Sequence, residues 1–369
     1  MKKLLTLILA LIMMLALVSC GEDEANELLA PYRDEEVKKF GYCTLDGEIK
    51  IEPQFDDAWT FAENGLAKVL TAGKYGFINE NGDYIAEPKF DTVGSFTENG
   101  LACVEINGKW GFVNEKGNMV IEPQFDNAES FAKNGLALVR ASGGYGYINE
   151  KGEMVIAPSF WDAGSFSANG LAPVYADGGW GYINDKGDMV IEPQFNQAEP
   201  FAENGLAKVA VAGKYGFIND KGDYVAEPQF DNAESFAKNG LALVYIDDKY
   251  GYIDETGNMA IEPQFDIAES FAENGLARVC IDYRYGYIDE TGKIAIEPQF
   301  PNAGNFQANG LACVMTNGGW GHINDKGEIT ANPDIQFGYD FEANGLARVR
   351  IGTNTVYIDE TGKPIEPKK

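Results

Sequence analysis

The sequence has a single histidine, His322, among 369 residues. Histidine is a common general base near neutral pH and the commonest metal ligand in proteins, so one copy leaves little for a catalytic or metal centre. No Gly-Lys-Ser/Thr phosphate loop is present either. His322 stands where related segments carry Phe112, Tyr147 and Tyr182, so we interpret it as an aromatic substitute in a core. We expect no catalytic residue, no metal and no cofactor.

Basic residues are scarce. Lysine and arginine total 29 against 57 acidic residues, and the net charge is −28. Binding to nucleic acid needs clustered basic side chains, so this balance excludes a nucleic-acid partner. It favours solubility, and it leaves cations or a basic partner open.

Cysteine is also rare, with five copies. Four of them, Cys43, Cys103, Cys280 and Cys313, fall outside the N-terminal leader. Cys103 and Cys313 occupy equivalent positions six sequence repeats apart, and the other two fall in different positions of the repeat. A disulfide needs Cα atoms within ~7 Å, so we interpret these four as free, small apolar residues.

Long hydrophobic runs are absent after the first 20 residues. Residues 4–18 form one apolar run behind Lys2 and Lys3, and the run closes on Leu17-Val18-Ser19-Cys20. The run is short and ends at small residues, which predicts a signal peptide over residues 1–19 rather than a spanning helix. The closing tetrapeptide resembles the lipobox of bacterial lipoproteins, which implies cleavage before Cys20 and lipidation of its sulfur. We therefore expect a lipid anchor on the extracytoplasmic face of a cell membrane, followed by a charged tether over residues 20–39.

A 35-residue repeat fills the rest of the chain, residues 40–369. An aromatic residue precedes glycine at a constant interval, at Gly41, Gly76, Gly111, Gly146, Gly181, Gly216, Gly251, Gly286 and Gly321. A fixed period in this range marks a repeat architecture with one continuous core. Residues 122–139 and 227–244 are identical over 18 positions, so the units are recent copies.

Each unit predicts three short strands. The first is aromatic-Gly-aromatic-Ile, and a turn with glycine at a position needing positive φ follows it. The second, as in Met119-Val120-Ile121, has consecutive apolar residues typical of a strand buried on both faces, and a proline then ends it. The third is Asn-Gly-Leu-Ala-x-Val, whose alternation predicts one buried face.

These units predict an all-β fold of nine to ten three-stranded antiparallel meanders. Two arrangements are compatible with them. A closed, β-propeller-like ring often splits one unit between its termini, and its blades usually have four strands. Because this chain begins and ends on the same elements, an open, twisted array is favoured, with the closed ring as the alternative.

The repeats resemble those of the WG (KWG) family of bacterial proteins. Lys109-Trp110-Gly111-Phe112 matches the namesake motif, and the Gly-Leu-Ala-x-Val and Val-Ile-x-Pro-x-Phe elements match as well. Most units have Tyr in place of Trp, which keeps a flat aromatic. The resemblance implies a β-rich repeat fold with no common activity, and it covers nearly all of residues 40–369.

Three aromatic residues are candidates for ligand binding. Trp59 and Trp161 stand where the other units carry small, acidic or amide residues, so no repeat rule demands an aromatic there. Tyr283 lies in the most variable segment of the unit, between the third strand and the next aromatic-Gly pair. Variable segments on a constant scaffold commonly carry specificity. Packing at a gap in the array is the alternative interpretation of both tryptophans.

Calcium is a weaker possibility. Turns such as Asn184-Asp185-Lys186-Gly187-Asp188 offer oxygens around a glycine, but calcium takes six to eight ligands and the lysine would repel it. An ordinary turn is the favoured interpretation.

The sequence therefore predicts a non-enzymatic cell-surface lipoprotein whose repeats bind protein or cell-wall polysaccharide. A pure structural spacer is the alternative. A cell-envelope hydrolase is disfavoured, because duplicated units rarely supply a unique catalytic pair of carboxylates.

Overall fold

The structure is a computed structural model that describes residues 28–365, except residues 35, 308, 317, 331–336, 342–345, 352–353 and 360–362. All regular structure in these residues is β-strand. No helix there is long and apolar enough to cross a membrane. The predicted signal peptide and Cys20 lie outside the described residues.

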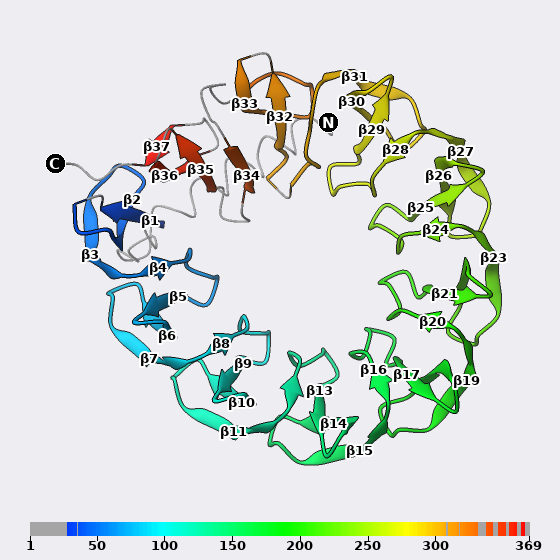
Figure 1. The fold of residues 1–369 in the computed structure, drawn as a ribbon, viewed down its shortest axis with the longest axis horizontal. Helices are drawn as coiled ribbons and strands as arrows, with labels where there is room; N and C mark the ends of the chain where they lie inside the picture. The colour runs from blue at the N-terminus through cyan, green and yellow to red at the C-terminus, as the bar shows by residue number, and fades with distance from the viewer. Residues whose placement is uncertain are drawn as a thin grey trace, which may run out of the picture.

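The strands form ten antiparallel sheets that follow one another around a ring with a central opening (Figure 1). Each complete sheet has four strands rather than three. In seven of these sheets the additional strand has only two residues and lies on the inner side of the ring, whereas the last strand has seven residues and lies on the outer rim (Figure 1). The all-β class and the tandem 35-residue repeats are confirmed.

The strands of the first five sheets have the following bounds: β1 Leu29–Asp34, β2 Lys39–Thr44 and β3 Ile49–Phe55; β4 Asp57–Ala58, β5 Leu66–Thr71, β6 Lys74–Asn79 and β7 Tyr84–Phe90; β8 Thr92–Val93, β9 Leu101–Ile106, β10 Lys109–Asn114 and β11 Met119–Phe125; β12 Asn127–Ala128, β13 Leu136–Ala141, β14 Gly144–Asn149 and β15 Met154–Phe160; β16 Asp162–Ala163, β17 Ala172–Ala176, β18 Gly179–Ile183 and β19 Met189–Phe195.

The other five sheets continue in the same order: β20 Gln197–Ala198, β21 Ala207–Val211, β22 Lys214–Ile218 and β23 Tyr224–Phe230; β24 Asn232–Ala233, β25 Leu241–Ile246, β26 Lys249–Asp254 and β27 Met259–Phe265; β28 Ile267–Ala268, β29 Ala277–Ile281, β30 Arg284–Ile288 and β31 Ile294–Phe300; β32 Ala312–Thr316 and β33 Gly319–Ile323; β34 Phe337–Phe341, β35 Ala347–Ile351, β36 Asn354–Ile358 and β37 Pro364–Ile365.

The turn between the third and fourth strands of a sheet is built as the sequence predicts. In the β22–β23 turn, the Asn219 side chain accepts hydrogen bonds from the backbone N–H groups of Lys221 and Asp223 at 3.0 Å. Gly222 has φ +85°, and a Cβ there would lie 3.2 Å from the Ile191 side chain of the preceding sheet. The glycine therefore answers two requirements, a left-handed backbone and close packing between sheets.

The core lies between neighbouring sheets. One cluster joins Phe112, Ile121 and Phe125 of one sheet to Phe131 and Val139 of the next. Equivalent clusters recur around the ring, so each unit buries its apolar face only with its neighbours, as in other repeat proteins. The outer strand is not buried on both faces, because Val120 is 41% exposed between Met119 and Ile121. That sequence interpretation is wrong, because alternate residues of this rim strand face solvent.

The arrangement is the ring that sequence analysis kept as the alternative, and the preference for an open array is corrected. Ala30, Tyr32 and Cys43 of the first sheet share a buried cluster with Tyr357 and Ile365 of the last sheet. Strand β1 also lies against β36. The first and last sheets thus bury the same kind of interface as any internal pair.

Closure explains why the predicted tether differs from the structure. Strand β1 falls within residues 20–39 and pairs along its whole length with β2, from Leu29 opposite Thr44 to Asp34 opposite Lys39. Leu29, Ala30 and Tyr32 are buried. These residues occupy the place that Leu-Ala-x-Val holds in other units, so the described part of the segment belongs to the ring.

Candidate binding surface

The hairpin tips between the second and third strands of the sheets lie on one face of the ring, which we call the tip face. The residue that follows each outer strand lies on the same face, because it binds a tip. Asp91 accepts a hydrogen bond from the Asn107 backbone N–H at 2.7 Å. Asn196 accepts one from the Ala212 N–H at 2.8 Å. This linking residue therefore connects an outer strand to the tip of the following sheet.

The linking residue also binds the tip of the preceding sheet, through a lysine 17 positions earlier. Lys109 lies 2.6 Å from Asp126, and the hydrogen bond from this lysine lowers the pKa of the Asp126 carboxyl. We call this contact the tip ion pair. It is present at Lys39–Asp56, Lys74–Asp91, Lys109–Asp126, Lys214–Asp231 and Lys249–Asp266.

The tip ion pair is replaced at three places in the described ring. Gly144 and Trp161 stand at one, Gly179 and Asn196 at the next, and Arg284 and Pro301 at the third. Since lysine and aspartate are missing together, the two columns vary as a pair. The exposed aromatic candidates lie at two of these three places.

Trp161 is one of them, and its side chain is 84% exposed. It follows the outer strand β15 and precedes the inner strand β16, at the position of Asp91 and Asp126 in other units. The sequence candidate is therefore an exposed indole on the tip face. An exposed tryptophan of this kind contributes little to a core, so Trp161 stays a candidate for ligand binding.

Tyr283 is the second, with 95% of its side chain exposed at the tip between β29 and β30. Its φ is +60°, at a position that is glycine in most units. A non-glycine residue in this region carries backbone strain, which is tolerated where function demands the side chain. Three sheets separate Tyr283 from Trp161, so the structure does not bring the two together.

Trp59 is partly buried and has partners. The Lys68 ammonium lies 4.2 Å from the centroid of its ring, and the Tyr75 ring lies at 5.7 Å. In other units the same pair of columns holds an ion pair, as in Glu199–Lys208 at 2.8 Å. Trp59 therefore replaces a carboxylate as the partner of a cation, which is a packing role.

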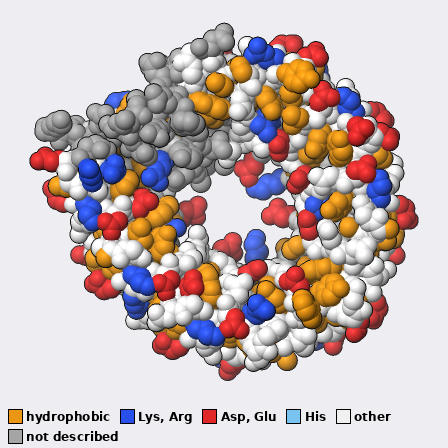
Figure 2. Space-filling model, in the orientation of Figure 1, with side chains coloured by type: hydrophobic (Ala, Val, Ile, Leu, Met, Phe, Trp, Pro, Cys, Tyr) orange, Lys and Arg blue, Asp and Glu red, His pale blue; other side chains and the backbone are white. Residues whose placement is uncertain are grey.

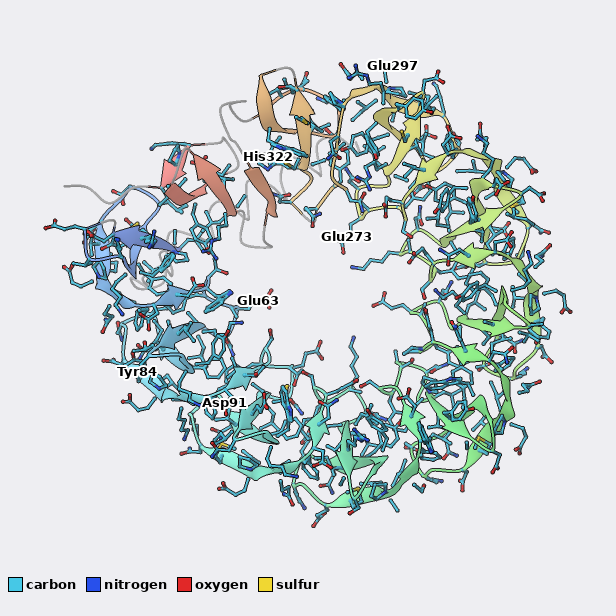
Figure 3. The ribbon with its side chains drawn as sticks, in the orientation of Figure 1. Glu63, Tyr84, Asp91, Glu273, Glu297 and His322 are labelled. Carbon is cyan, nitrogen blue, oxygen red and sulfur yellow. The ribbon has the colours of Figure 1, made fainter. Side chains whose placement is uncertain are left out.

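The inner rim carries grooves that sequence analysis missed. One of them has a volume of about 1110 Å³ and crosses four consecutive units, and Phe96, Phe131, Phe166 and Phe201 are among its lining residues. Charged residues on the loops before the second strands line this groove and two smaller grooves. Two of these residues, Glu63 and Glu273, point into the central opening (Figure 3). Acidic and basic side chains mix around this opening (Figure 2). The sequence did contain a signal for these grooves. One position of the repeat, in the loop before the second strand, varies among Glu, Lys and Ala: Glu63, Glu98, Lys133, Ala168, Glu203, Lys238 and Glu273.

The other candidates for chemistry have structural roles. His322 is 1% exposed in β33, opposite Cys313, as an aromatic substitute would be. The Asn184 side-chain oxygen accepts hydrogen bonds from the N–H groups of Lys186 and Asp188, so this turn is an Asx turn. No cluster of three or more His, Cys, Asp and Glu that could hold a metal occurs in the part of the chain that the structure describes.

None of the four cysteines after the leader, Cys43, Cys103, Cys280 and Cys313, forms a disulfide in the described residues, as predicted, and all four are buried. Burial raises the pKa of the Cys43 thiol to about 11. A thiol with so high a pKa is a poor nucleophile at neutral pH.

The model of the WG containing repeat matches nine consecutive segments: residues 40–75, 75–110, 110–144, 145–180, 180–215, 215–250, 250–285, 285–320 and 320–352. The chain belongs to the WG-repeat family. A comparison with curated proteins gives no match. The WG repeats therefore establish what the chain is built from, and the surface must indicate what it binds.

Solved structures similar to the WG-repeat ring are β-propeller-like. The crystal structure of a eukaryotic initiation factor has a TM-score of 0.52 at 11% identity, with 92% of this chain and 95% of that chain covered. Sqt1 of Saccharomyces cerevisiae has a TM-score of 0.39 at 9% identity, with 74% and 94% covered. At such identities the first of these likenesses shows the fold alone.

Proposed function

We propose that this WG-repeat ring is a non-enzymatic binding scaffold, held at the extracytoplasmic face of a cell membrane by a lipid on Cys20. The observation that carries the proposal is Trp161, an indole exposed by 84% where five other units place an ion-paired aspartate. The interior of the ring repeats from unit to unit. Selection for packing alone gives no reason to expose a tryptophan.

The repetition also supports a role without catalysis. Each carboxylate of the interior has copies in other units, so a unique pair tuned for acid–base chemistry is not expected. The single histidine lies in the core. Burial of the thiols raises the pKa of Cys103 and Cys280 as well.

The closed shape argues against the spacer. An open array lengthens with each added unit, whereas a ring joined through Tyr32 and Tyr357 keeps its ends together whatever its repeat number. A protein selected for reach gains nothing from that joint. A protein selected for a fixed, rigid display surface does.

A capture experiment tests the binding role. The chain should begin at residue 21, because residues 28–34 contain β1 and close the ring. It is immobilised without lipid and challenged with purified wall polysaccharide and with purified secreted proteins of the same organism. Specific retention of one defined component supports the scaffold. Retention of none by a correctly folded ring contradicts it.

Two variants locate the surface. Trp161→Asp installs the residue that this position carries in five other units, so the fold should be unaffected. Trp59→Ala removes a partnered tryptophan and serves as the control. Loss of retention with the first variant and not the second places the contact on the tip face.

The anchor is tested separately. Cys20→Ser removes the only sulfur that the predicted lipobox offers. We expect the wild-type chain in the membrane fraction, labelled by a radioactive fatty acid, and the variant unlabelled. Equal labelling of both would contradict the lipid anchor and leave the binding role untouched.

A further inference from the structure

The exposed tryptophan and the glycine tips beside it point to one class of ligand. We propose that Trp161, with the Gly143–Gly144 and Gly178–Gly179 tips, forms a binding site for an uncharged saccharide chain. The inference deepens the proposed function and rests on it.

The position of Trp161 between two tips follows from the repeat. Its equivalent Asp91 binds Lys74 of the tip before it and the Asn107 N–H of the tip after it. For Trp161 the tip before it is that of β13 and β14, and the tip after it is that of β17 and β18. Phe160 pairs with Tyr145, which sets Trp161 beside Gly144.

Both tips carry glycine at two consecutive positions. A Cβ on Gly143 or on Gly178 would meet no atom within 4 Å, so these tips border open space. Gly144 and Gly179 stand where other units carry the lysine of the tip ion pair. No lysine side chain from this position therefore covers the indole. Two consecutive units therefore give up the ion pair and leave a shallow, uncovered surface around one flat aromatic ring.

Acceptors for hydroxyl groups occur next to Trp161 in the sequence and at the second tip. Asp162 follows Trp161 directly and is exposed; one of its carboxylate oxygens accepts the Ala163 N–H at 2.9 Å, and the other stays available to a ligand. Asp177 lies exposed at the second tip. Tyr175, opposite Asp162 in the sheet, is half-buried and packs against Trp180, with the ring centroids 5.8 Å apart.

This combination fits a sugar. The face of an aromatic ring carries partial negative charge, which attracts the C–H groups on one side of a pyranose. Carboxylates accept hydrogen bonds from its hydroxyl groups. An anionic polymer is disfavoured for two reasons. The chain has a net charge of −28, and Gly144 replaces the lysine that other units place 17 positions before this residue.

A protein partner fits less well. A stable protein interface covers about 800 Å² per partner and contains several apolar anchors. The exposed apolar residues nearest in the sequence, Met154 and Val155, lie at the far end of the seven-residue strand β15, about 20 Å away. The tips that flank Trp161 offer only glycine in their place.

Affinity electrophoresis tests the proposal, with the chain from residue 21 run through gels that contain dextran, laminarin, xylan, mannan or, as the anionic probe, polygalacturonate. An array of immobilised neutral and acidic oligosaccharides widens the search. We expect at least one neutral saccharide to bind, and Trp161→Asp to weaken it by about tenfold. Met154→Ala, which removes an exposed apolar side chain from the far end of strand β15, is the matched control and should bind as the wild type does.

The outcomes separate the inference from the proposed function. Binding of no neutral saccharide, or equal binding by Trp161→Asp, overturns the inference. If the variant instead loses a captured protein while no saccharide binds, the scaffold stands and the ligand class is wrong. Circular dichroism and thermal unfolding of Trp161→Asp, matched to the wild type, exclude a folding defect.

Discussion

Closure of the ring can be tested at Tyr32, the largest side chain of β1. It is buried and shares a cluster with Tyr357, which stands more than 300 residues later in the chain. Truncating a buried aromatic side chain costs about 3 to 5 kcal/mol. We expect Tyr32→Ala to lower the free energy of unfolding by that amount.

The hydroxyl group provides the matched control. Tyr32 Oη has no hydrogen-bond partner in the part of the chain that the structure describes, and burial raises its pKa to about 12. Removing a buried polar group without a partner is close to neutral or stabilising. Tyr32→Phe should therefore unfold at the same urea concentration as the wild type, or at a higher one.

A double-mutant cycle separates closure from local packing. Tyr32→Ala and Tyr357→Ala are measured alone and together by urea unfolding, followed by fluorescence and circular dichroism to confirm one shared transition. If the two ends pack together, the effects are non-additive by about 1 kcal/mol. Additivity within about 0.3 kcal/mol would refute the closed ring, whatever the size of the single effects.

Three further predictions concern the repeat itself. Gly222→Ala should lower the free energy of unfolding by about 1 to 3 kcal/mol, because the turn needs positive φ and the Ile191 side chain lies 3.2 Å from the new Cβ. An unchanged midpoint of urea unfolding would contradict this prediction. Tyr147→Phe should lower the free energy of unfolding by about 1 kcal/mol, since the phenol donates a hydrogen bond to the Gly164 carbonyl at 2.7 Å. Several units carry Phe at this position, so a variant that fails to fold would contradict the prediction. The hydrogen bond from Lys74 lowers the pKa of Asp91, so the stability that this carboxylate contributes is present above its unfolded pKa near 4 and is lost as pH falls. Asp91→Asn should therefore make the free energy of unfolding fall less steeply as the solution is acidified. An unchanged pH dependence would contradict this assignment.

The sequence predicted the unit well because its signals are local and repeated. The turn glycine, the aromatic-Gly pair and the alternation of Ala67 and Val69 each appear many times, so chance variation in one copy does not hide them. The fourth strand was missed because two residues, such as Gln197 and Ala198, are too few to carry a period.

Closure was missed because its evidence lies in one altered copy. Leu29-Ala30-Pro31-Tyr32 corresponds to Leu171-Ala172-Pro173-Val174, but Leu28 replaces the glycine that begins the motif. Charged residues on both sides made the segment look like a tether. The contact that reveals its role joins it to the other end of the chain, which no local pattern can show.

The candidate site was predicted in part. Exposure of Trp161 and Tyr283 follows from their positions outside the repeated core. Trp59 has a partner, Lys68, nine positions later, and this contact favours the packing interpretation that the sequence had left open. Two other units place a glutamate and a cation at the same two positions.

Because the chain closes into a ring, the identical segments 122–139 and 227–244 affect how the protein can change its number of units. Recombination between their coding sequences would remove three units and leave seven sheets instead of ten, a number that closed propellers commonly have. The lost stretch, residues 140–244, contains Trp161 and both glycine tips beside it. The gene thus carries a one-step route to a smaller ring without Trp161, and the larger ring persists only where selection maintains what those three units add.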